Sequence, residues 1–323
     1  MSSPHDALFK HVFSQPEHAA SELRAVPPAG LSARLDWSSL ELEPSSFVDE
    51  QLRGRQADLL FRIGCQGRSA FLYILFEHQS STDALMAFRL LRYMTRIWDA
   101  FLLANPRAER LPAIIPVVLH HGDSGWSRGT EFGALLDVDP ETLPLVAEYV
   151  PQFRFVLDDL SGADDHALRG RSLTAVAAAG LMLLARGRSG PSLVDDLRRW
   201  LDVLGDVAAA RNGMEALTAF LEYAFRVGDV LPEDLRRLAL QIGPAAEEAY
   251  MTAAQKLTEE SYARGRAEGE AKGKAELLIR LLGLRFGTLP EATREKILRA
   301  LPDRLDVWAE RVIAGRSLEE ILG

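Results

Sequence analysis

The chain has 323 residues, 47% of them hydrophobic, which is enough to bury one or two cores and excludes a disordered chain as the default. Its formal net charge of −9 argues against a protein that coats nucleic acid through bulk positive charge. Residues 1–110 hold 12 Lys and Arg against 13 Asp and Glu, a net of −1, which leaves −8 for the rest. The net charge therefore neither supports nor excludes DNA binding by the N-terminal part.

Cysteine usage and apolar runs indicate the compartment. Cys65 is the single cysteine, so the chain forms no intramolecular disulfide and suits a reducing environment. Met1–Lys10 is polar and lacks the apolar run of a secretory signal. The longest nearly uninterrupted apolar stretch, Leu173–Ala185, is shorter than the roughly 20 residues that span a membrane. We therefore expect a cytoplasmic protein without a membrane segment.

The first elements expected along the chain are two short helices within His5–Val26, the second of which begins near Pro16. Three extended segments follow, at Ser46–Leu52, Gln56–Ile63 and Phe71–His78. The last two are rich in apolar residues, and a short connection containing glycine separates them. This pattern predicts a β-hairpin.

A strong helix and a further strand come next. The residues before Asp83 can cap a helix start, and Asp83–Ala104 carries a helical pattern. Ala113–His120 is apolar and β-branched and predicts a buried strand despite its proline, and Gln152–Leu157 is a further strand candidate. From Leu168 to Ile242 the pattern is mainly helical. The order helix–β–β–β–helix–β predicts an α/β protein with a mixed four-stranded sheet in residues 1–125.

The rest of the chain divides into three expected parts. These are a mostly helical extension (126–250), a glycine-spaced segment (251–276) and a small helical domain (277–323). Glycine recurs every fourth residue in the middle part, at Gly265, Gly269 and Gly273. Each weakens a helix by about 1 kcal/mol relative to alanine, yet it lets two helices approach closely. A solvated connecting helix or linker is the favoured interpretation, and a homodimer seam through residues 252–276 is the alternative.

Acidic residues stand at the ends of the two strands of the hairpin. Asp58 lies in an otherwise apolar strand, and Glu77 ends the next one, with Gln79 on the same face because strand side chains alternate. Two converging carboxylates repel each other unless a cation neutralises them. Oxygen ligands suit Mg²⁺ or Mn²⁺ rather than zinc. Because a single carboxylate at a strand end is usually only solvated, the pair alone leaves both interpretations open.

Several short motifs occur in an order that resembles a known family. They are His5–Ser14, Ala57–Phe61, Phe76–Ser81 and His120–Trp126. Together they look like the recombination-promoting nuclease (Rpn, or YhgA-like transposase) family of the PD-(D/E)XK nuclease superfamily. The resemblance covers roughly the first half of the chain. Near the C-terminus, Leu284–Pro290 is similar to a small helical domain often appended to such proteins.

The resemblance implies a Mg²⁺-dependent DNA endonuclease, with Mn²⁺ as a substitute, acting in recombination or mobile-element biology. Asp58 and Glu77 would be the metal-ligating carboxylates, and the backbone carbonyl of His78 a further ligand. Gln79 stands where the superfamily motif has lysine, and glutamine can orient a water but offers no positive charge. Glu22, on the second helix, would be able to reach the same metal, but the favoured interpretation of this residue is a solvated surface acid.

Arginines on the helix after Glu77 offer a candidate DNA face. Arg89, Arg92 and Arg96 share one side of it, where they can meet successive phosphates. The apolar set opposite them comprises Leu85, Leu91, Ile97 and Leu102. An ordinary solvated helix face is the equal alternative. Arg53 and Arg55, close to Asp58 in the sequence, are further candidates.

A second hypothesis comes from another class of protein. The chain can retain the nuclease fold as a catalytically silent DNA-binding or protein-interaction module, because Gln79 departs from the motif and the net charge is acidic. The adjacent His120 and His121, with Asp123 nearby, favour loop structure over a metal site, because neighbouring side chains at a strand end point apart. Cys65 has no basic neighbour that would activate it as a nucleophile.

Overall fold

A computed structural model of the protein describes residues 3–44, 58–65, 68–79, 82–122, 124–187, 192–314 and 317–323. For Asp58, residues 68–79 and residues 313–314 it describes the backbone alone. The expected strand Ser46–Leu52 and the two arginines Arg53 and Arg55 lie outside the described residues. The chain divides into two compact units, Met1–Ala253 and Ala254–Gly323.

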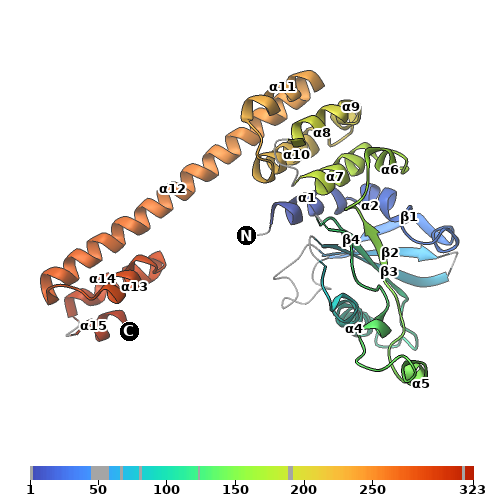
Figure 1. Cartoon of the computed structure of the whole chain (residues 1–323), viewed down its shortest axis with the longest axis horizontal. Helices are drawn as coiled ribbons and strands as arrows, with labels where there is room; N and C mark the ends of the chain where they lie inside the picture. Colours follow the sequence, from blue (N-terminus) through green and yellow to red (C-terminus); the bar gives the residue numbers. More distant parts are fainter. Residues whose placement is uncertain are drawn as a thin grey trace. The chain divides into compact units, whose positions relative to one another are not determined.

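The first unit is built on a mixed five-stranded sheet with the order β1-β2-β3-β4-β5 (Figure 1). The strands are β1 (Leu35–Leu42), β2 (Asp58–Cys65), β3 (Arg68–Gln79), β4 (Ile114–His120) and β5 (Val156–Asp159). The first three strands pair antiparallel, and β4 and β5 add in parallel. The expected α/β class is confirmed.

Strand β1 was not among the expected strands. Only Leu35 and Leu40 are buried in it, and its register with β2 shifts between Asp36 and Glu41. This irregularity breaks the alternation of apolar and polar residues by which a half-buried strand is recognised in a sequence. The expected strand Ala113–His120 does form, as β4, with its proline inside the strand.

Helices cover both faces of the sheet (Figure 1). On one side lie α1 (Pro4–Phe13), α2 (Pro16–Leu23) and α7 (Ala175–Arg186), and on the other lies α4 (Met86–Ala104). Helix α10 (Gly213–Val227) packs on α1. The shorter helices are α3 (Ala29–Ser32), α5 (Leu143–Val146), α6 (Asp165–Arg169), α8 (Leu193–Arg199), α9 (Leu201–Ala209) and α11 (Pro232–Ile242). The two predicted N-terminal helices are thus observed, and the α1 start has a capping box formed by Ser3 and Asp6.

Helix α4 differs from its expected start and from its expected buried face. It begins at Met86, because Asp83 accepts the backbone N–H of Leu85 at 2.9 Å and forms a turn before the helix. Of the four apolar residues expected on the buried face, Ile97 alone is buried, while Leu85 and Leu102 are 57% and 40% exposed. The residues of α4 that are buried form a different stripe: Met86, Ala87, Leu90, Tyr93, Met94 and Ile97. The helix carries apolar residues on more than one side, so contact with the sheet decides which stripe is buried.

The first unit includes both the part expected as the core and the part expected as its helical extension. Strand β5 extends the sheet beyond β4, with Leu119 and Asp158 as Cα partners. Helices α7 and α10, which also follow residue 125, pack on α1 at the start of the chain. The parts expected as a core and as a helical extension therefore share one compact unit.

The second unit contains the later part of α12 (Pro244–Phe286), followed by α13 (Glu291–Leu298), α14 (Pro302–Ala314) and α15 (Leu318–Leu322). Its core centres on Leu282, Ile297, Trp308 and Ile321. The glycine-spaced segment is helical, and every residue from 258 to 270 is exposed. Among the described residues, no helix combines the length and apolar character needed to cross a membrane.

Helices α1 and α7 approach each other so closely that their contact requires a glycine, which has no side chain. A Cβ added at Gly180 would lie 2.9 Å from Cγ2 of Val12, which is fully buried, whereas one added at Gly205 in α9 would meet nothing within 4 Å. Because alanine favours a helix over glycine by about 1 kcal/mol, we expect Gly205→Ala to stabilise the protein and Gly180→Ala to destabilise it. Urea denaturation measures both. A stabilising Gly180→Ala would contradict the packing described here.

Candidate active site

The register between β2 and β3 brings the two expected acids together. Asp58 and Glu77 are direct Cα partners in the antiparallel pair, at the start of β2 and near the end of β3. On the other side of β3, Glu77 is the Cα partner of Val118, which packs into the cluster with Met86 and Leu90 of α4. Strand alternation therefore assigns backbone positions 58 and 77 to the sheet face that α4 covers.

The residue types at this pair of positions are oxygen donors. Two carboxylate-bearing residues in direct register, with the backbone carbonyl of the following His78, match the hard ligands that Mg²⁺ and Mn²⁺ prefer. The sulfur and imidazole ligands typical of zinc are not part of this set. Elsewhere, the side chains that the structure describes contain no group of three or more His, Cys, Asp or Glu able to hold a metal. The donor set therefore fits the cation that the sequence implies.

Gln79 lies two residues after Glu77, on the last position of β3. Its Cα partner on the parallel strand β4 is His120, whose side chain is 1% exposed. The Nε2 atom of His120 is 2.9 Å from the backbone carbonyl oxygen of Ser124, in the loop that leaves the strand. The ring also meets Trp126 edge-on, with 5.4 Å between centroids. A buried imidazole thus lies next to the strand end that carries Gln79.

The two adjacent histidines face opposite sides of the strand, as expected. His120 contacts Trp126, which packs against the α4-side cluster, whereas the ring of His121 lies 5.0 Å from that of His5 in α1. His5 in turn hydrogen-bonds the Tyr223 hydroxyl through Nδ1 at 2.8 Å. Asp123 lies outside the described residues. The histidines therefore connect the end of β4 to two different layers.

Asp159 anchors the loop after β4. It is the Cα partner of His120, and its carboxylate accepts the backbone N–H groups of Trp126 at 2.8 Å and Ser161 at 3.1 Å. Burial alone would raise the pKa of Asp159, but these hydrogen bonds and nearby His120 hold it below its ordinary value. The carboxylate therefore stays charged and keeps the loop against the strand ends.

Glu22 is not a solvated surface acid, contrary to the favoured interpretation of the sequence. Its side chain is 0% exposed and accepts a hydrogen bond from Arg171 at 2.9 Å. Arg171 also binds both carboxylate oxygens of Asp158, at 2.7 and 2.8 Å. Asp158 alternates with Leu157, which packs on the α4 side, so it lies on the opposite sheet face. Glu22 therefore belongs to a buried ion cluster away from the face assigned to Asp58 and Glu77.

The cluster holds two carboxyl groups against one guanidinium. Burial raises the pKa of Glu22 well above its ordinary value of 4.5, and the hydrogen bond and like charge of Asp158 raise it further, while Arg171 opposes the shift. The same pairing raises the pKa of Arg171, so its charge is permanent. Protonation of Glu22 would leave one carboxylate and one guanidinium, which would balance the buried charge.

The arginines of α4 are not equivalent. Arg89 is held by Asp83 at 3.3 Å and by the Tyr93 hydroxyl at 3.0 Å, which ties it to its own helix. Arg92 is exposed, and Arg96 is partly buried. Of the three residues expected to share a DNA face, Arg92 is thus the most accessible to a phosphate.

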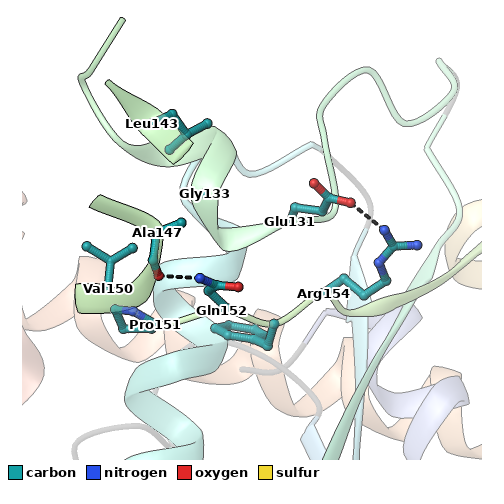
Figure 2. A pocket seen from close by; sticks show the side chains of 9 residues that line it. Glu131, Gly133, Leu143, Ala147, Val150, Pro151, Gln152 and Arg154 are labelled. Atoms are coloured by element: carbon teal, nitrogen blue, oxygen red, sulfur yellow. Dashed lines mark hydrogen bonds and ion pairs between the residues drawn. The ribbon is translucent and has the colours of Figure 1, made fainter. Parts of the chain in front are cut away.

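A separate pocket of about 470 Å³ is lined by residues of the segment that connects β4 to β5 (Figure 2). Its walls come from residues 131–154, and none of the expected site residues lines it. Two contacts hold it, the ion pair of Arg154 with Glu131 and the hydrogen bond from Gln152 to the Ala147 carbonyl (Figure 2). The pocket is largely apolar apart from these groups and is distinct from the strand-end site.

Sequence reasoning missed Asp158, Asp159 and Arg171. The signal available for Asp158 and Asp159 was their place at the end of an apolar strand, the same signal that identifies Glu77. Arg171 lies between helices, and nothing local distinguishes it from other surface arginines. For Glu22, its spacing from Ala19 and Leu23 placed it on the buried stripe of α2.

The fold and the strand-end acids define an α/β protein with a candidate catalytic centre on a mixed sheet. Comparison with known proteins identifies the group to which it belongs. Residues 3–212 match the family described as "Putative transposase, YhgA-like", and the chain belongs to this family.

Curated relatives carry nuclease names. The chain is 31% identical over 229 residues to the recombination-promoting nuclease RpnD of Escherichia coli O157:H7, covering 71% of this chain and 83% of RpnD. It is 27% identical over 285 residues to the inactive recombination-promoting nuclease-like protein RpnE of E. coli K12, covering 87% and 90%. It is 38% identical over 121 residues to the recombination-promoting nuclease RpnA of E. coli K12, covering 38% and 41%. No solved structure matches the chain.

The buried Glu22 predicts a pH dependence of stability. Because its pKa is raised in the folded state, folding takes up a proton, and this contribution is present below pH 4.5 and lost as the pH rises through the folded pKa. We expect the free energy of unfolding to fall with pH in that window by up to about 1.4 kcal/mol per unit relative to Glu22→Gln, which removes the titration.

Urea denaturation from pH 4.5 upward measures this difference. Glu17→Gln, an exposed acid on the same helix, is the matched control and should show the wild-type slope. Identical slopes for the wild type and Glu22→Gln would contradict the raised pKa of Glu22.

Proposed function

We propose that the protein is a metal-dependent DNA endonuclease with a PD-(D/E)XK core. The observation that carries the proposal is the direct register of Asp58 with Glu77 at neighbouring strand ends. The order of elements around this pair, with helices α1 and α2 first, then strands β1 to β3, helix α4 and strand β4, supports the proposal because the sequence resemblance implies a helix–β–β–β–helix–β order. Phosphodiester hydrolysis is the reaction such a pair of acids serves best.

The chain's own residues would have distinct roles in this reaction. The carboxylates of Asp58 and Glu77 and the backbone carbonyl of His78 would hold Mg²⁺, with Mn²⁺ as a substitute. When bound, the ion supplies an activated water and neutralises charge that builds on the phosphate. Gln79 would orient the attacking water through its amide, and it cannot add positive charge as lysine would.

The names of the relatives support DNA cleavage, and one of them also supports a second, non-catalytic function. RpnD and RpnA are called recombination-promoting nucleases, which supports DNA as the substrate and recombination as the context. RpnE, which aligns over more of the chain, is called inactive. A catalytically silent DNA-binding or protein-interaction module is therefore the second candidate, and Gln79 is the residue that favours it.

Two further features belong to the proposed function. The exposed Arg92 on α4 would contact the DNA backbone beside the acids, with Arg89 and Arg96 as weaker candidates. A homodimer through residues 252–276 would supply two active sites for the two strands of a duplex. The exposed stretch from 258 to 270 leaves this surface accessible to a second copy and equally fits the solvated connecting helix.

Removal of either acid should abolish cleavage. We expect the protein to nick supercoiled plasmid in Mg²⁺ or Mn²⁺ but not in EDTA, and Asp58→Asn or Glu77→Gln to lose at least about 100-fold in rate. Glu41→Gln is the matched control, because Glu41 is an exposed acid on the same sheet that pairs with Arg62. Plasmid cleavage that survives in Asp58→Asn would remove these residues from the site. A folded wild type that binds DNA without cleaving it would establish the silent module instead.

Arg92 should contribute to DNA affinity through charge alone. Loss of one phosphate contact lowers the slope of log K against log salt by about 0.9, so we expect Arg92→Ala to weaken binding equally across sequences and to reduce the slope by that amount. Fluorescence anisotropy at several salt concentrations measures the slope. Arg211→Ala, an exposed arginine before α10, should leave it unchanged. An unchanged slope in Arg92→Ala would exclude α4 as the phosphate-binding face.

A further inference from the structure

Two apolar side chains and one basic side chain lie exposed at the start of helix α4. Leu85, the residue before the helix, is 57% exposed, and Phe88, in its first turn, is 46% exposed. Arg92, one turn further along, is exposed as well. Their spacing of three and four residues places all three on one face of the helix, opposite the buried stripe. Leu85, Phe88 and Arg92 together are called the α4 patch.

The α4 patch is anchored next to the candidate site. Met86 and Leu90, on the buried side of the same two turns, pack in one cluster with Val118. Val118 is the Cα partner of Glu77 on β3. A helix is about 10 Å across, which is the length of about three nucleotides of a stacked strand. A DNA strand that reaches the row of Glu77 can therefore also reach the α4 patch.

The charges on this face favour a phosphate backbone as the partner. Within the described part of the chain, Arg92 makes no ion pair. Asp83, the acid before the helix, is held by Arg89 at 3.3 Å. Asp99, the next acid of α4, lies seven residues beyond Arg92, which is about two turns. The positive charge of Arg92 is therefore available to an anion beside the exposed ring of Phe88.

The phenyl ring determines which part of a DNA strand fits beside that phosphate. Phenylalanine has no polar atom for the backbone or for base edges, and its ring can only stack or pack. In a continuous duplex the base faces are already covered by their neighbours. A base that has left the stack offers its face, and aromatic side chains bind such bases in a sequence-tolerant way. The Cβ atoms of residues four apart on a helix lie about 5–6 Å from each other, so ring and guanidinium can act on one stretch of strand.

We propose that Phe88 is a stacking platform for an unpaired base of DNA, with Leu85 extending its apolar surface and Arg92 binding a neighbouring phosphate. The inference rests on the proposed DNA substrate and deepens it. It names the substrate class as DNA that carries unpaired bases near the cleavage site. A continuous duplex would first have to be unstacked to bind in this way, which weakens its binding.

Fluorescence anisotropy in EDTA separates stacking from charge. The probes are a mixed-sequence single strand, a strand of equal length built from abasic sites, and a duplex. We expect Phe88→Ala to weaken binding of the single strand at least about 5-fold and to leave the other two unchanged. Arg92→Ala should weaken all three. Undiminished binding of the single strand by Phe88→Ala, or an equal loss on all three probes, overturns the platform.

A matched control lies at the other end of the same helix. Leu103 is 83% exposed, so Leu103→Ala also removes an exposed apolar side chain from α4. We expect this variant to bind all three probes like the wild type. A loss on the single strand equal to that of Phe88→Ala would make the effect one of general surface hydrophobicity and would overturn the proposal.

An added indole reports stacking directly. Phe88→Trp should bind the single strand at least as tightly as the wild type, and its fluorescence should be quenched by that strand but not by the abasic one. Leu103→Trp is the control and should show no added quenching. The five native tryptophans are common to both variants, so the difference between them reports the added ring. Equal quenching in the two variants overturns the platform.

The binding experiments contain no metal and therefore do not depend on cleavage. If Phe88→Ala loses single-strand affinity while the wild type cuts no DNA in Mg²⁺, the platform stands and the nuclease proposal fails. If the wild type cleaves plasmid while Phe88→Ala binds single strands normally, the nuclease stands and the platform is overturned. A wild type that binds no single strand overturns the platform as well.

Discussion

The structure depends above all on the register of strand β3, which has one antiparallel and one parallel neighbour. Strand β3 pairs antiparallel with β2 and parallel with β4, so its last residues lie between a hairpin partner and a crossover partner. The antiparallel side aligns Glu77 with Asp58, and the parallel side aligns Gln79 with His120. A shift of one residue in either pairing would move every side chain to the other face. One register thus brings residues from three strands to one sheet face.

The two faces of the sheet divide the acidic residues between separate tasks. On the α4 face, backbone positions 58 and 77 stand in direct register. Two carboxylates that converged there would repel each other unless a cation neutralised them. On the opposite face, Glu22 and Asp158 share Arg171 and are closed off from water. Breaking such a buried group by removing one partner is strongly destabilising, by about 3–5 kcal/mol. The cluster therefore joins α2 to β5, and its charge balance serves stability rather than cleavage.

Local patterns predicted the hairpin of β2 and β3, the buried strand β4 and the first two helices, because each depends on a short apolar run or a capping signal. What they missed depends on tertiary contact. Strand β1 has an irregular register, α4 offers more than one apolar stripe, and the burial of Glu22 requires Arg171 from a distant segment. For the candidate site, the residue types and their spacing were sufficient to predict that Asp58 and Glu77 come together, and the register of β2 with β3 makes them Cα partners. The positions of His120 and Asp159 emerged only from the parallel pairing, which no local pattern encodes.

The departure from lysine at Gln79 is best understood together with its neighbour on β4. A lysine brings its own charge and needs no partner to define its polarity, whereas an amide presents a donor on one side and an acceptor on the other. A strand end that carries glutamine therefore offers a donor and an acceptor, where a lysine would offer positive charge. The Cα partner of Gln79 on β4 is His120, whose buried ring lies 2.9 Å through Nε2 from the Ser124 carbonyl oxygen. The loop that follows β4 thus lies beside the strand end that carries Gln79, and Asp159 holds that loop to the sheet.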